Sequence, residues 1–91
     1  MVKLHFIGYL KEKAGAKVIE VELKKPVTFE ELVERYLSDD VKSLIKEKYM
    51  GFEADDIIIV ISGESLDLKG GTKAVIKNED ELFFLPNISG G

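Results

Sequence analysis

The chain has 91 residues, a formal net charge of −4 and no cysteine. Without cysteine it cannot contain a disulfide, a Cys-based zinc site or a catalytic thiol. The negative charge disfavours nucleic acids and anionic membranes as main partners, because both are bound largely through basic surfaces, and the length predicts one domain with one modest core.

The first part of the chain is predicted to form a β-hairpin. A strand over residues 2–9 is indicated by the alternation of three apolar residues, Val2, Leu4 and Phe6. After a polar turn that contains Gly15, a second strand is indicated by three further alternating residues, Ile19, Val21 and Leu23. We expect the two strands to pair with each other.

Two helices are predicted next. Thr28 and Glu31 have the spacing of a capping box, which starts a helix by satisfying two backbone N–H groups. The apolar stripe of this first helix has helical periodicity and consists of Phe29, Leu32, Val33, Tyr36 and Leu37. A second helix is predicted from a cap at Ser38 or Asp39 to a terminator at Gly51. Its expected buried residues are Val41, Leu44, Ile45 and Tyr49.

The last part of the chain is predicted to return to the sheet. The expected elements are a strand at 57–61, a tight turn at Ser62-Gly63, a short return strand at 65–68, a helical turn within 72–77 and a last strand at 81–85 that Pro86 ends. This order predicts an α+β fold of the β-grasp type, a mixed sheet with its helices on one face. We expect one domain over residues 1–86 and a flexible tail over residues 87–91.

No internal catalytic or metal site is predicted. His5 lies opposite the buried positions of the first strand and is interpreted as a surface histidine. Residues 69–73 contain Gly-Gly-Thr-Lys but lack the spacing of a phosphate-binding loop, so they indicate a turn. The acidic residues at 55–56 and 79–81 lack the ligand count of a calcium loop. We therefore expect no metal, no permanently bound cofactor and no catalysis by the chain alone.

The end of the sequence offers a different chemistry. The α-carboxylate of Gly91 would be ionised at neutral pH and could attack the α-phosphate of ATP in the active site of another protein. Five residues follow Pro86, and they can extend roughly 16 to 18 Å. Gly90 and Gly91 have no Cβ and therefore fit a narrow channel. The alternative is a terminus that merely frays.

The final segment resembles the MoaD/ThiS family of ubiquitin-like sulfur carriers. The residues that carry the resemblance form an acidic turn, an apolar strand, a proline and a tail of small residues, Asp80-Glu81-Leu82-Phe83-Phe84-Leu85-Pro86-Asn87-Ile88-Ser89-Gly90-Gly91. Residues 1–14 and 59–67 fit the first strand and the central hairpin of the family less specifically. The resemblance covers nearly the whole chain and implies a ubiquitin-like β-grasp fold.

The resemblance also implies a function. In this family a ubiquitin-activating-like enzyme uses ATP to adenylate the terminal glycine, which corresponds to Gly91 with Gly90 beside it. The glycine becomes a thiocarboxylate and donates sulfur. Members of the MoaD branch supply sulfur to a pterin precursor in molybdenum-cofactor (molybdopterin) biosynthesis, and they insert the tail into the large subunit of molybdopterin synthase. This chain differs from many members of that branch in having Pro86-Asn87 in place of two prolines. The predicted second helix also makes the middle of the chain longer than that of a minimal member.

Two alternatives stay open. Archaeal ubiquitin-like modifiers share the same ending and attach it to lysines of other proteins. The chain could also be a passive ubiquitin-like binding module.

Partner docking is predicted near the root of the tail. If Val2, Leu4 and Phe6 face the helices, Ile7 and Tyr9 point to the open side of the sheet. We expect five residues before the glycines to contact partners, Phe83, Leu85, Pro86, Ile88 and Ser89. The alternative is ordinary exposed apolar surface. The start of the sequence lacks a basic leader, so we expect a cytoplasmic location.

Overall fold

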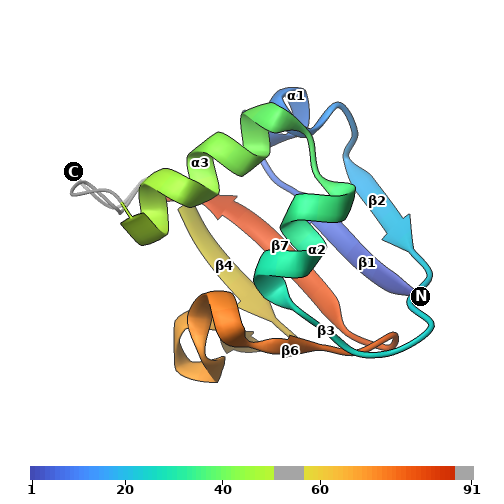
Figure 1. Cartoon of the computed structure of the whole chain (residues 1–91). Helices are drawn as coiled ribbons and strands as arrows, with labels where there is room; N and C mark the ends of the chain where they lie inside the picture. Colours follow the sequence, from blue (N-terminus) through green and yellow to red (C-terminus); the bar gives the residue numbers. More distant parts are fainter. Residues whose placement is uncertain (51–56, 88–91) are drawn as a thin grey trace.

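The computed structural model describes residues 1–50 and 57–87 of the chain. The strands are β1 (Val2–Phe6), β2 (Val18–Val21), β3 (Val27–Thr28), β4 (Ile57–Ile61), β5 (Glu64–Ser65), β6 (Val75–Ile76) and β7 (Glu81–Pro86) (Figure 1). The α-helices are α1 (Leu10–Ala14), α2 (Phe29–Tyr36) and α3 (Asp39–Met50). Two short 3₁₀ helices, η1 (Leu66–Lys69) and η2 (Gly71–Lys73), lie between β5 and β6.

Five strands form a mixed sheet in the order β2-β1-β7-β4-β5. β1 and β7 are parallel, with Leu4 opposite Leu82, and the other pairs are antiparallel. β3 and β6 form a separate two-stranded ladder. β7, the last strand in sequence, therefore lies in the centre of the sheet between β1 and β4 (Figure 1).

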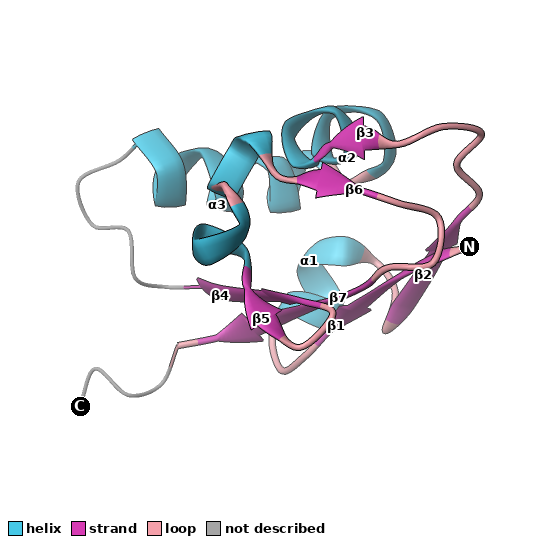
Figure 2. Cartoon of the chain, turned by 90° about the horizontal axis from the view of Figure 1, so that it is seen from below, coloured by secondary structure: helices cyan, strands magenta, loops and turns pink. Residues whose placement is uncertain are grey.

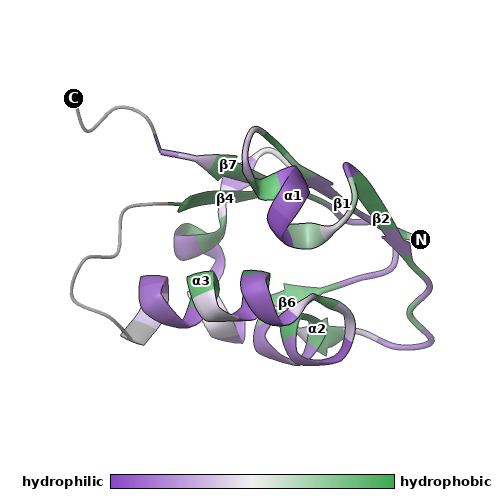
Figure 3. Cartoon of the chain, turned by 90° about the horizontal axis from the view of Figure 1, so that it is seen from above, coloured by the Kyte–Doolittle hydropathy of each residue, from purple (hydrophilic) through white to green (hydrophobic). Residues whose placement is uncertain are grey.

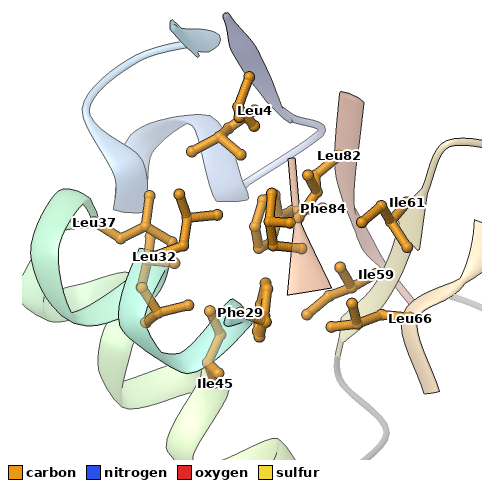
Figure 4. Close-up of a cluster of buried hydrophobic side chains, with 14 of the residues drawn as sticks. Leu4, Phe29, Leu32, Leu37, Ile45, Ile59, Ile61, Leu66, Leu82 and Phe84 are labelled. Carbon is orange, nitrogen blue, oxygen red and sulfur yellow. The ribbon is translucent and has the colours of Figure 1, made fainter. Parts of the chain in front are cut away.

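The helices lie on one face of this sheet. Figure 2 shows α2, α3 and the β3–β6 ladder in a layer over the five strands, with α1 on the same side, and Figure 3 shows the same layers from the opposite direction. The buried core fills the space between the layers (Figure 4). At its centre the ring of Phe84 lies 4.8 Å from that of Phe6 and 6.2 Å from that of Phe29. The predicted α+β class, with a mixed sheet and helices on one face, is confirmed.

Both predicted helix starts are confirmed. The Thr28 hydroxyl accepts a hydrogen bond from the backbone N–H of Glu31, and the Glu31 carboxylate accepts one from the backbone N–H of Thr28, which completes the capping box. The Ser38 hydroxyl accepts from the N–H of Val41 at the start of α3. The predicted end of that helix at Gly51 lies outside the described residues.

The prediction for Tyr36 is wrong, because its side chain is 41% exposed. The other predicted residues of the α2 stripe are buried, namely Phe29, Leu32, Val33 and Leu37. Tyr36 is the last residue of α2 and lines a surface pocket together with Lys24 and Lys25 of the β2–β3 connection. The next residue, Leu37, belongs to the buried core, whereas Tyr36 does not.

The predicted hairpin pairs as expected, with Val2 opposite Val21, but the prediction for its connection is wrong. The first strand ends at Phe6 instead of residue 9, and α1 follows. The reason is Gly8, whose φ of +64° turns the chain out of the strand. Gly15, at φ +78°, ends α1 and donates its N–H to the carbonyl of Lys11.

The segment after β4 differs in detail from its prediction. Ser62 and Gly63 both have positive φ, which confirms the tight turn. The return strand stops at Ser65, because the chain then coils into η1 and buries Leu66 in the core. The helical turn expected within 72–77 is η2 at 71–73, and the next residues form β6 instead.

Candidate functional site

β7 presents two different faces. Leu82 and Phe84 are buried beneath the helices, whereas Phe83 and Leu85 are only half-buried on the opposite face of the sheet. This follows from the alternation of side chains along a strand. The structure therefore places two predicted partner-binding residues, Phe83 and Leu85, on the face that the described helices leave uncovered.

The strands beside β7 extend this apolar surface. Leu85 lies opposite Ile58 of β4, and Phe83 lies opposite Val60 of the same strand. Ile58 is 40% exposed, and Val60 is half-buried. These four residues, Phe83, Leu85, Ile58 and Val60, are called the open-face patch below. Cross-strand neighbours on one sheet face are in contact range, so the patch is continuous.

His5 borders the open-face patch on the β1 side. Its ring stacks on the ring of Phe83, with centroids 4.3 Å apart and planes 7° from parallel. Its Nε2 atom lies 2.7 Å from Oε2 of Glu81. The prediction that His5 lies on the face opposite the buried residues is confirmed. Its stack on Phe83 was not predicted, because it depends on the parallel register of β1 and β7.

Pro86 ends β7 and marks the root of the tail. The turn that follows β1 packs against it: a Cβ atom built on Gly8 would lie 3.0 Å from Cγ of Pro86. The preceding residue, Ile7, donates its N–H to the carbonyl of Phe84 at 3.0 Å. Ile7 and Tyr9 are 40% and 45% exposed, as expected for the open side, but they belong to this turn and not to the strand. Gly8 was missed by the sequence analysis, although a glycine that interrupts an alternating pattern is a signal for such a turn.

The remaining predicted site residues are Ile88, Ser89, Gly90 and Gly91, and they lie outside the described residues. Before these residues, the structure defines a platform made of the open-face patch, Pro86 and the turn at Gly8.

The shifted pKa values belong to groups away from this platform. Hydrogen bonds from the backbone and hydroxyl of Thr28 lower the pKa of Glu31. Partial burial and a hydrogen bond to Asp67 raise the pKa of Tyr49 above its ordinary range. The ion pair with Glu30 raises the pKa of Lys73. Each of these three shifts is explained by a contact between described residues.

Two further observations concern the residues 1–50 and 57–87. They contain no group of three or more His, Asp or Glu side chains that could hold a metal ion. No helix among them is long and apolar enough to cross a membrane.

Comparison with known proteins gives matches only at the level of structure. No family model matches the sequence, and no curated protein matches it significantly. Urm1 from Trypanosoma brucei matches over 99% of this chain and 94% of its own, with a TM-score of 0.76 and 16% identity. The small archaeal modifier protein 1 (SAMP1) from Methanosarcina acetivorans matches over 99% and 95%, with a TM-score of 0.58 and 27% identity. CysO in the BexX/CysO complex from Amycolatopsis orientalis matches over the full length of both chains, with a TM-score of 0.61 and 24% identity.

These structures are ubiquitin-like β-grasp proteins, and the predicted fold is thereby confirmed. Urm1, SAMP1 and CysO are ubiquitin-like proteins of the MoaD/ThiS sulfur-carrier type. The structural matches establish the fold, and because the identities are low, the activity of this chain is inferred from its site.

Proposed function

We propose that this chain is a sulfur carrier whose working group is the carboxylate of Gly91. The observation that supports this most is the continuity from β7 into the tail. The partly exposed open-face patch lies on β7 and β4, β7 ends at Pro86, and the sequence then continues directly to Gly90-Gly91. A patch that precedes a short glycine-terminated tail gives a partner both a surface to bind and a reactive end to reach.

The proposed chemistry has two steps, and both take place in the active site of a ubiquitin-activating-like enzyme. A carboxylate oxygen of Gly91 attacks the α-phosphorus of ATP and releases pyrophosphate. A hydrosulfide-class nucleophile then attacks the carbonyl carbon of the acyl-adenylate, forms the C–S bond and expels AMP. The product is a C-terminal thiocarboxylate. ATP is consumed by the enzyme, and this chain holds no cofactor of its own.

We further propose that the thiocarboxylate donates its sulfur to a pterin precursor in molybdopterin biosynthesis. In this assignment the chain is the small subunit of molybdopterin synthase, and its tail enters the large subunit. The basis is the resemblance of residues 80–91 to the MoaD branch. That CysO was solved in a complex with BexX supports the general idea that such a carrier works with a protein partner.

The first test is intact-mass spectrometry after incubation with ATP, the activating enzyme and a sulfide source. We expect the chain to gain the mass difference between one sulfur and one oxygen, confined to its C-terminal peptide. A variant that lacks Gly91 should show no gain. An unmodified chain in the presence of an enzyme that is active on another substrate would reject the carrier function.

The acceptor is tested separately. The thiocarboxylated chain is mixed with the large subunit and the pterin precursor, and the loss of sulfur from the chain is followed together with its appearance in the pterin. Loss of sulfur to a different acceptor, with none in the pterin, would exclude the molybdopterin assignment while leaving the carrier function intact.

The second candidate function is protein modification through Gly91. It is favoured by the match to SAMP1 of Methanosarcina acetivorans, which has the highest identity of the three structures described above and is named a modifier protein. This function predicts isopeptide adducts between Gly91 and lysines of cellular proteins, detectable as branched peptides after digestion. A passive binding module would instead keep its full activity after deletion of Gly90 and Gly91.

A further inference from the structure

The turn after β1 restricts the space in which the tail begins. Gly8 has a φ of +64°, a conformation that side chains with a Cβ rarely adopt. A Cβ at this position would also lie 3.0 Å from Cγ and 3.6 Å from Cδ of Pro86. Two independent reasons therefore favour glycine here, one from the backbone and one from the proline ring.

Two other glycines show that the backbone reason and the proline-ring reason are independent. Gly15 and Gly63 have φ values of +78° and +88°, but a Cβ on either would meet no atom within 4 Å. Both positions need glycine only for the backbone. At Gly8 the missing Cβ also leaves the space that the ring of Pro86 occupies.

Pro86 is held from two sides. Its backbone continues β7, where it lies opposite Ile57, and its ring contacts Gly8. The hydrogen bond from the N–H of Ile7 to the carbonyl of Phe84 fixes the turn against the same strand. The ring of proline also fixes its own φ, so Pro86 itself has little conformational freedom.

We infer that Gly8 is a positioning residue that sets the path of the tail relative to the open-face patch. The inference rests on the proposed function, in which one enzyme holds the patch and receives the carboxylate of Gly91. That carboxylate lies five residues beyond Pro86. A displacement of the Pro86 ring to make room for a Cβ changes the starting direction of those residues without changing the side chains of the patch.

The test compares Gly8→Ala with Gly15→Ala in adenylation, measured as ATP–pyrophosphate exchange at varied concentrations of the chain. Both variants place a Cβ at a positive φ, and only Gly8→Ala pushes on Pro86. We expect Gly8→Ala to lower kcat about 10- to 100-fold, the cost of a small misplacement of reacting groups, and to leave KM within about twofold. Gly15→Ala should keep both values.

A third variant tests the contact itself. Pro86→Ala removes the Cγ and Cδ atoms that a Cβ on Gly8 would meet. In the double variant, Gly8→Ala should then have little additional effect on kcat beyond that of Pro86→Ala. An effect of Gly8→Ala that is equally large with and without the proline ring would overturn the inference.

A readout without enzyme separates this inference from the proposed function. Since the chain has no cysteine, Ser89→Cys provides a single attachment point for a nitroxide label. The label broadens the NMR signals of nearby backbone amides, and we expect the pattern over β7 and β4 to change in Gly8→Ala and to stay unchanged in Gly15→Ala. If the wild-type chain is not adenylated at all, the proposed function fails, and this pattern still decides the positioning role.

Folding is checked by circular dichroism. Should Gly8→Ala not fold, Pro86→Ala opens the same contact from the other side and should alter the broadening pattern in the labelled chain. An unaltered pattern in every folded variant would refute a positioning role for Gly8.

Discussion

Phe83 and Phe84 are adjacent in sequence and lie on opposite faces of β7, so replacing each by alanine should separate stability from partner binding. Phe84 is 1% exposed and stacks on Phe6 within the core. Phe83 is half-buried and stacks on His5 at the surface. We expect Phe84→Ala to destabilise the fold strongly and Phe83→Ala mainly to weaken the binding of the activating enzyme.

The magnitudes follow from these environments. Removing a fully buried phenylalanine costs about 3 to 5 kcal/mol, because transfer free energy is lost and a cavity remains. In a domain of this size each kcal/mol lowers Tm by about 4 to 8 °C, so Phe84→Ala should lower it by roughly 20 °C. For Phe83→Ala we expect about 1 to 2 kcal/mol, since part of an apolar side chain and one ring stack are lost.

The stability assay is denaturation in urea, followed by circular dichroism, with the midpoint shift read at constant slope. The binding assay is the KM of the chain in adenylation, which Phe83→Ala should raise about 10- to 30-fold if the ring is a binding hot spot. Phe84→Leu, a milder core change, is the matched control and should leave KM near that of the wild type. Equal losses of stability in Phe83→Ala and Phe84→Ala would refute the assignment of the two faces.

Three further predictions concern the contacts that stabilise the helices. Thr28→Ala removes the cap of α2 and should cost about 1 kcal/mol in denaturant titrations. Because folding lowers the pKa of Glu31, the stabilisation by its carboxylate is present above pH 4.5 and is lost as the pH falls through the folded-state pKa. The difference in the free energy of unfolding between the wild type and Glu31→Gln should therefore shrink in acid. A constant difference from pH 7 to pH 3 would contradict this. Folding raises the pKa of Tyr49, so its contribution is complete below pH 10.0 and declines at higher pH. Tyr49→Phe, which loses the hydrogen bond to Asp67, should cost about 1 kcal/mol at neutral pH and show a weaker loss of stability in alkali, measured by thermal unfolding across this range.

The sequence was sufficient for the features that local spacing determines. Thr28 and Glu31 lie three positions apart and predicted a capping box, which the structure contains. The alternation of side chains along a strand likewise accounts for the placement of Phe83 and Phe84 on opposite faces of β7. Such features need no knowledge of distant partners, because the period of a strand or helix fixes them.

Features that depend on distant partners were not predictable. α1 has one buried residue, Leu10, so it leaves no apolar stripe to recognise. β3 and β6 have two residues each and exist because they pair with each other across a large separation in sequence. The contact between Gly8 and Pro86 arises from the parallel placement of β1 beside β7, and neither residue alone indicates the other.

The reach of the tail constrains how partners use the open-face patch. Residues 87–91 extend roughly 16 to 18 Å at most, so any active site that receives Gly91 must lie within that distance of Pro86. A globular enzyme that approaches within this distance can also contact the end of β7, where Leu85 belongs to the patch. The proposed activating enzyme and the proposed sulfur acceptor face the same restriction. We therefore expect the two proposed partners to bind the carrier in turn, with release from the first before sulfur reaches the second.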